Sequence, residues 1–404
     1  MGEKNQTVSM RWGYMVIGVV AMLFAGVLYA WSILKSPLSA TFGWGQSELA
    51  LNFTLAMTFF CVGGLLGAQL SKRWGHRVAL VLAGALSATG FVSTALLNDV
   101  SVLMLYITYG VLAGTGIGIA YNVVIATVSA HFADKKGLCS GFLMMGFGAS
   151  ALILGNAADA MFKSVLGWRA TYAVLGCAIL IVLTLAAVIL KKPAPAKEDG
   201  TKNAAEQVPE KCDFTTKQML CRASFWLAFL CISFLAAVGS SVISFAKDLV
   251  LSVNAPEALA VSLVGVLSVC NGFGRILTGI VFDAIGCRKT MVCANILTIG
   301  AAAVTLIAVQ TNSLSLCIVG VCLTGMSYGA CPTITAAFTS SRFGMKHFSN
   351  NMAIMTFTVM VGSFVATAAN KVLEATGGYT GVFGMLLSLT VIALVLNMCI
   401  TKKS

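Results

Sequence analysis

Arg275 is the residue whose type and position most clearly suggest chemistry in this chain. It is the one basic side chain placed well inside a long apolar stretch, residues 264–281. An arginine near the centre of a bilayer costs about 2.5–3.5 kcal/mol even on the mildest insertion scale. A planar guanidinium does not lose its proton and offers a two-donor fork to a carboxylate. Arg275 therefore predicts an anionic partner.

The acidic residues offer Arg275 no partner within the chain. Of the 14 acidic residues, only Asp159 falls inside an apolar stretch, and it stands four residues before Lys163, where a local helical ion pair is expected. The alternative role for Arg275 is structural, capping carbonyls at a helix interface. A bound carboxylate is the favoured interpretation, because no acid is placed to neutralise the guanidinium.

The elements that must position Arg275 are membrane-spanning helices. The chain has 404 residues, of which 58% are apolar and 10% charged, too little polar surface for a water-soluble globule. Stretches long enough to cross about 30 Å of hydrocarbon as helix recur along it. They lie at about 14–35, 49–71, 78–98, 101–130, 138–162, 168–190, 224–246, 257–282, 290–310, 313–340, 349–370 and 379–400. We predict an all-α membrane protein with twelve transmembrane helices, since the alternating strands of a closed barrel are missing.

The distribution of basic residues indicates orientation rather than a polyanionic partner. Most of the 26 lysines and arginines fall in alternate connecting segments, and only Lys35, Lys163, Arg169, Lys247 and Lys371 fall in the others. This positive-inside bias predicts a multi-pass protein of the cell (plasma or inner) membrane with both termini cytoplasmic. The expected surroundings are lipid, no nucleic-acid partner is expected, and we expect a functional monomer.

Residues 191–222 divide the predicted spans into two sets of six. The segment is charged, carries prolines and is poor in apolar residues, as is typical of a cytoplasmic linker. We therefore predict an N-terminal six-helix bundle over 1–190 and a C-terminal six-helix bundle over 223–404. Short motifs of the first bundle recur in the second about 210 residues later. This offset predicts parallel repeats with a substrate site at their interface.

The repeated loop between the second and third helix of each half carries the first family resemblance. Residues 279–289 contain Asp283, Gly286 and Arg288, and resemble the loop signature of the major facilitator superfamily. The first copy keeps Gly75 and Arg77 but has lysine at the acidic position. The resemblance implies the twelve-helix fold of that superfamily and a conformational role for these five residues.

Four further stretches resemble the oxalate/formate antiporter family and the related monocarboxylate transporters; they are residues 26–31, 114–122, 132–141 and 167–169. The resemblance implies that Arg275 binds a substrate carboxylate. It also implies that Tyr29, Tyr121 and Tyr328 line an anion cavity, with Trp31 and Asn122 as weaker candidates. For each tyrosine, packing or interface anchoring is the alternative.

Three positions depart from these relatives in ways that narrow the expected substrate. Asn271 stands one turn before Arg275, where monocarboxylate transporters carry a proton-coupling aspartate, and could still contact substrate. Val359 and Thr324 are both expected to face the cavity, and they stand where the oxalate-carrying branch has a lysine and a tryptophan. With a single buried cation, a monocarboxylate is expected rather than a dianion, because an unpaired buried charge costs several kcal/mol.

Two further features concern movement and entry. Pro332 is expected to kink the tenth helix near the cavity, as the only proline within a predicted span. Lys35 and Lys247 close the first helix of each half at equivalent outer positions. Ordinary snorkelling at a helix end is favoured over a positive vestibule for anions.

The predicted function is secondary active transport of a small monocarboxylate by alternating access. An oxalate:formate antiporter is the alternative within transport, and a membrane sensor that binds carboxylate without moving it is the alternative from another class. We expect no enzyme, because the spans lack buried Ser/His, paired aspartates or metal-ligand spacing. No metal and no cofactor is expected, and the 13 cysteines suggest packing rather than disulfides.

Overall fold

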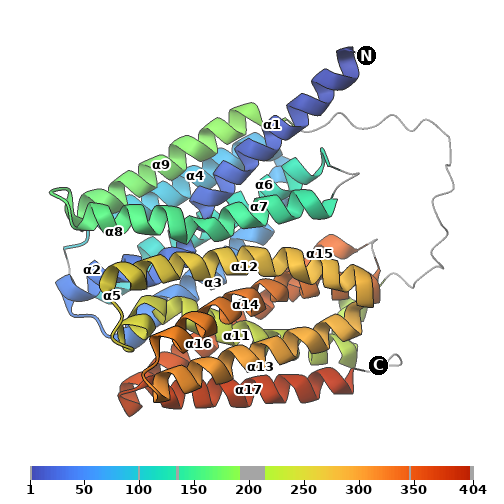
Figure 1. The fold of residues 1–404 in the computed structure, drawn as a ribbon. Helices are drawn as coiled ribbons and strands as arrows, with labels where there is room; N and C mark the ends of the chain where they lie inside the picture. The colour runs from blue at the N-terminus through green and yellow to red at the C-terminus, as the bar shows by residue number, and fades with distance from the viewer. Residues whose placement is uncertain (1, 99–100, 133–135, 192–213, 345–346, 401–404) are drawn as a thin grey trace.

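The computed structural model describes residues 2–98, 101–132, 136–191, 214–344 and 347–400, and these residues form helices and connecting turns without a strand (Figure 1). Among them, 11 helices are long and apolar enough to cross a membrane. A twelfth, α16 (Phe357–Thr376), packs among these against α3 and α11. The predicted all-α fold with twelve transmembrane helices is confirmed.

The first half of the chain forms six spans, three of them built from shorter pieces. Its elements are α1 (Gly2–Ala25), η1 (Gly26–Ala30), α2 (Trp31–Phe42), α3 (Gln46–Arg73), α4 (Gly75–Ala95), α5 (Val102–Leu105), η2 (Tyr106–Ala113), α6 (Gly114–Ser129), α7 (Lys136–Ser150), η3 (Ala151–Gly155), α8 (Asn156–Phe162) and α9 (Gly167–Ile189). The second half repeats the plan. Its elements are α10 (Thr216–Leu220), α11 (Ala223–Leu251), α12 (Glu257–Ile285), α13 (Cys287–Gln310), α14 (Leu314–Phe343), α15 (Phe348–Met355), α16 and α17 (Tyr379–Cys399).

The two halves meet along three pairs of helices. In Figure 1 most of the first half (blue to green) lies above the second half (yellow to red), and α2 and α3 lie level with α12, where the halves meet. Across this boundary α3 packs on α16, α7 and η3 pack on α12, and α2 packs on α11. We call the end at which α9 ends and α11 begins the linker end, and the other the opposite end.

Small residues let α12 approach α7 and η3 closely at this boundary. A Cβ atom on Gly148 would lie 2.6 Å from the backbone oxygen of Ser268, and one on Gly265 would lie 2.4 Å from the Cα atom of Leu152. Both distances are below any normal carbon contact, so no other residue fits without separating the helices. Such small-residue contacts are the usual basis of helix association in membranes.

The first helix of each half is interrupted. In the first half the tight 3₁₀ segment η1 separates α1 from α2. In the second half α11 has a non-helical backbone at Phe245 (φ −129°, ψ 20°). Short 3₁₀ stretches and local breaks within long helices often mark hinges. Both interruptions precede the lysines at the opposite end, Lys35 and Lys247.

Two prolines lie inside membrane helices, not one. Pro332 lies within α14, which continues as a single helix to Phe343. Pro37 lies within α2, because the first span extends to Phe42, beyond its predicted end. The expectation that Pro332 is the only proline within a span was therefore wrong.

Candidate functional site

A cavity of about 440 Å³ lies between the two halves of the chain. Its lining comes from both halves, including Tyr29 of η1, Tyr121 of α6 and Arg275 of α12. It also includes Ala68 and Gln69, which are exposed on the last turns of α3 at the linker end. The cavity therefore connects the middle of the bundle with the linker end.

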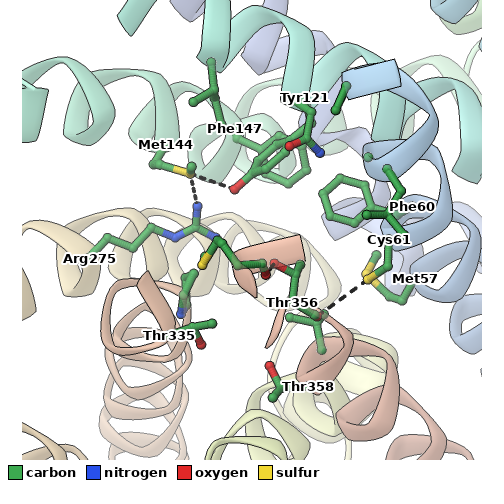
Figure 2. Close-up of a pocket in the computed structure, with 18 of the residues that line it drawn as sticks. Met57, Phe60, Cys61, Tyr121, Met144, Phe147, Arg275, Thr335, Thr356 and Thr358 are labelled. Carbon is green, nitrogen blue, oxygen red and sulfur yellow. Dashed lines mark hydrogen bonds between the residues drawn. The ribbon is translucent and has the colours of Figure 1, made fainter. Parts of the chain in front are cut away.

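Arg275 reaches across the boundary between the halves, and its guanidinium meets neutral acceptors only. Nε donates to Asn271 Oδ1 (3.3 Å), Nη2 donates to Tyr29 Oη (3.4 Å), and Nη1 donates to Met144 Sδ. The side chain is 8% exposed. Within the described residues no carboxylate forms an ion pair with it. Figure 2 shows the guanidinium pointing from α12 towards Met144 and the aromatic side of the cavity.

Aromatic rings of the first half form the wall that faces Arg275. Phe147 makes edge contacts with Tyr29 and with Tyr121, at centroid distances of 5.0 and 5.2 Å. Phe60 makes a third edge contact with Tyr121 (5.0 Å). From the other half, Tyr328 lies 6.1 Å from Tyr29. Edge-to-face rings are rigid and apolar, with phenol hydroxyls as polar handles, which suits the body of a small organic ligand.

The structure brings most of the predicted binding residues into this cavity. Its lining includes Arg275, Tyr29, Tyr121, Tyr328 and Asn122. Asn271 and Trp31 lie outside the lining and are fully buried. Asn271 accepts a hydrogen bond from Arg275 Nε through its side-chain oxygen. Trp31 donates its indole N–H to the Leu49 carbonyl (3.0 Å).

Sequence reasoning missed several lining residues, namely Met57, Phe60, Met144 and Phe147. Nothing about a methionine or phenylalanine in an apolar span distinguishes a cavity wall from ordinary packing. The one available signal was Phe147, which stands between two glycines at 146 and 148.

Of the predicted conformational residues, Pro332 of α14 lines the cavity, whereas those of the repeated loop lie away from it, in the turns at the linker end. Gly75 and Gly286 occupy equivalent turns and adopt left-handed backbone angles, with φ of +85° and +79°, which favour glycine. Arg77 and Arg288 lie two residues further along and are both exposed. The side chain of Asp283 lies outside the described residues.

The two positions that separate this chain from the oxalate-carrying branch differ in location. Val359 lines the cavity and presents an apolar side chain there. Thr324 is fully buried and is not part of the lining, so the expectation that it faces the cavity was wrong.

The opposite end of the boundary is closed by polar contacts between the halves. Lys35 of α2 forms an ion pair with Asp248 of α11 at 2.8 Å, and its Nζ also donates to Gln46 Oε1 at 2.6 Å. The lysine is only 3% exposed, and Lys247 is 5% exposed. Both were expected to snorkel to the surface, and this is wrong because each has a buried position with an acidic partner.

Two further carboxylates complete the closure. Glu374 of α16 accepts hydrogen bonds from the Ser47 backbone N–H (2.7 Å) and hydroxyl (2.6 Å) of α3. Glu257 of α12 lies 3.0 Å from Lys247 of its own half and 3.7 Å from Lys163 of the other. Lys163 also forms the predicted local pair with Asp159 (2.8 Å), and this hydrogen bond raises the pKa of Lys163.

Comparison with known proteins identifies the fold. The sequence profile of the Major Facilitator Superfamily matches residues 13–267 and 229–404. The chain belongs to the Major Facilitator Superfamily. This superfamily member resembles a solved structure of the nucleoside transporter NupG with a TM-score of 0.72 at 11% identity, over 97% of this chain and 100% of that one.

Several curated relatives of this major facilitator have names that state a carboxylate substrate. It is 29% identical to the oxalate:formate antiporter of Oxalobacter formigenes over 298 residues, which cover 72% of this chain and 68% of that protein. It is 23% identical to human monocarboxylate transporter 12, over 92% and 77% of the two chains. It is also 26% identical to the uncharacterized transporter YhjX of Escherichia coli (strain K12), over 87% and 86%.

Proposed function

We propose that this major facilitator is a secondary active transporter of small monocarboxylates, and that Arg275 binds the substrate carboxylate. The observation that carries the proposal is the Arg275 guanidinium, which lies in a cavity between the halves with only neutral acceptors in the described structure. A buried guanidinium without an anion is costly. A carboxylate entering the cavity supplies the missing charge in a geometry that the fork can match.

The orientation follows from the positive-inside rule, which assigns the linker end to the cytoplasm of the cell. The cavity opens at that end, and the polar contacts at Lys35, Ser47 and Glu257 close the other. The conformation is then inward-facing. Alternating access requires the same contacts to break and the linker end to close.

A monocarboxylate is proposed over oxalate because Arg275 is the single cation among the described residues that line the cavity. Val359 supplies no charge where the oxalate-carrying branch has lysine. A second carboxylate would be desolvated beside valine without a partner, at a cost of several kcal/mol. Formate, acetate, lactate or pyruvate should be preferred over oxalate by at least about tenfold in affinity.

Uptake of labelled formate and lactate by purified protein in proteoliposomes tests this proposal. Arg275→Gln should reduce uptake at least about tenfold while expression stays intact, and Arg275→Lys should rescue it only weakly because lysine lacks the fork. Arg222→Gln, at an exposed arginine of the linker end, is the matched control and should transport normally. Parental uptake in Arg275→Gln would exclude the assignment, and binding without any flux would favour the sensor.

The same assay tests the proposed substrate class. Oxalate should compete poorly with the best monocarboxylate in the parental protein. Val359→Lys adds a second cation to the cavity wall and should shift the preference towards oxalate. Competition by oxalate as strong as that by monocarboxylates in the parental protein would favour the oxalate:formate antiporter.

A further inference from the structure

The thioether of Met144 lies where two hydrogen-bond donors of the site converge. Tyr121 Oη donates to Met144 Sδ at 3.0 Å, and Arg275 Nη1 donates to the same sulfur atom. Figure 2 shows this sulfur between the phenol and the guanidinium. Tyr121 and Met144 belong to the first half, whereas Arg275 belongs to the second, so the sulfur joins the two halves at the centre of the cavity.

A thioether is a poor acceptor for either donor. Sulfur accepts hydrogen bonds weakly, whereas the guanidinium carries a permanent charge and a phenol is a strong donor. The other two acceptors of Arg275, on Asn271 and Tyr29, are neutral and lie at 3.3 and 3.4 Å. The position between Tyr121 and Arg275 is therefore suited to a stronger acceptor than the one that occupies it.

Met144 is also able to leave this position. Its side chain is unbranched with three rotatable bonds, and it lines the cavity with intermediate exposure. Little stabilising energy is lost when a weak acceptor is withdrawn, provided that a charged acceptor replaces it.

We propose that Met144 is a displaceable substitute for the substrate carboxylate. Its sulfur occupies the acceptor position in the empty site, and a carboxylate oxygen replaces it when substrate binds. The substrate then connects Arg275 of one half with Tyr121 of the other through a charged acceptor. Binding thereby strengthens the link between the halves. This inference rests on the proposed function and adds a residue that sets affinity.

Three substitutions at Met144 change the strength of the resident acceptor in steps. Met144→Leu keeps the size without an acceptor and should leave the KM for lactate or formate unchanged or up to about threefold lower. Met144→Gln supplies an amide oxygen that competes with substrate and should raise KM about tenfold. Met144→Glu supplies a carboxylate and should abolish uptake. Met145→Gln is the matched control; this neighbour lies against Gly272, outside the cavity, and its KM should change less than about twofold.

A second measurement needs no substrate. The melting temperature of Met144→Glu should exceed that of Met144→Gln in the parental background, and this order should reverse in an Arg275→Gln background, where the new carboxylate has no partner. If the order of the two melting temperatures is the same in both backgrounds, the inference is overturned. Equal KM values for the leucine and glutamine variants would overturn it too. If the parental protein moves none of the carboxylates, the proposed function fails, while the melting temperatures still decide the role of Met144.

Discussion

Helix α3 meets the other half of the transporter in opposite ways at its two ends. Near its start, Ser47 holds the Glu374 carboxylate, and Thr54 is fully buried, with its hydroxyl 2.7 Å from that of Thr367. Near its end, Gln69 is exposed and lines the cavity. The same helix therefore takes part in the closed end and in the open end of the boundary.

The opposite end is closed by several polar contacts between the halves, most of them partly exposed. The carboxylates that close the opposite end, Asp248, Glu257 and Glu374, all belong to the second half, and they contact lysines or a serine of the first. Ion pairs that are partly exposed contribute only about 0–1 kcal/mol each. The opposite end is therefore held closed by several weak contacts around one more buried ion pair, Lys35 with Asp248.

Two cysteines placed on α3 would measure the two ends separately. Thr54→Cys reports on the closed end and Gln69→Cys on the open end, with labelling by a thiol reagent quantified for each peptide by mass spectrometry. In the otherwise unchanged protein we expect strong labelling at 69 and weak labelling at 54. For each variant the quantity compared is the ratio of labelling at 54 to labelling at 69.

The largest effect is expected for Lys35→Glu. The substitution places a second carboxylate against Asp248 where a largely buried ion pair stood. Losing such a pair and adding repulsion should open this end and raise the labelling ratio at least about tenfold.

The charge-reversed double variant is the control for this change. Lys35→Glu combined with Asp248→Lys restores opposite charges and should return most of the closure. If the double variant labels like the single one, the ion pair does not hold this end.

A smaller effect is expected for Glu374→Gln. The amide can keep one acceptor for Ser47 but loses the charge, so the labelling ratio should rise about threefold. Glu48→Gln is the matched control, because the Glu48 carboxylate accepts from the Gly45 backbone N–H within its own half. An equal rise in both variants would exclude a role for Glu374 in closure.

The smallest effect is expected for Lys163→Gln. Lys163 is 53% exposed and lies 3.7 Å from Glu257, which keeps the closer lysine at 247. The labelling ratio should change less than about twofold. Lys247→Gln should change it more, because this removes the buried partner and leaves Glu257 with the weaker contact. The reverse order would show that contact across the halves matters more than burial.

The sequence was sufficient to predict the fold and the centre of the site. Twelve apolar stretches and a buried arginine without an acid are properties of local composition, and the lining of the cavity includes three tyrosines named beforehand. The ion pair of Lys35 with Asp248 joins residues more than 200 positions apart, so no local pattern indicates it. The acceptor role of Met144 was not predictable either, since it depends on which face of α7 meets α12.

The short 3₁₀ segment η1 connects the closed opposite end with the proposed substrate site. Tyr29 belongs to this five-residue segment, and its hydroxyl touches the guanidinium. Lys35 lies in α2, directly after the segment. We expect that a tilt of α2 that separates Lys35 from Asp248 also turns η1 and withdraws the Tyr29 hydroxyl from Arg275. If Arg275 binds the substrate as proposed, its contact with Tyr29 is then lost as the opposite end opens, and we expect substrate release to that side to begin before the halves have finished moving apart.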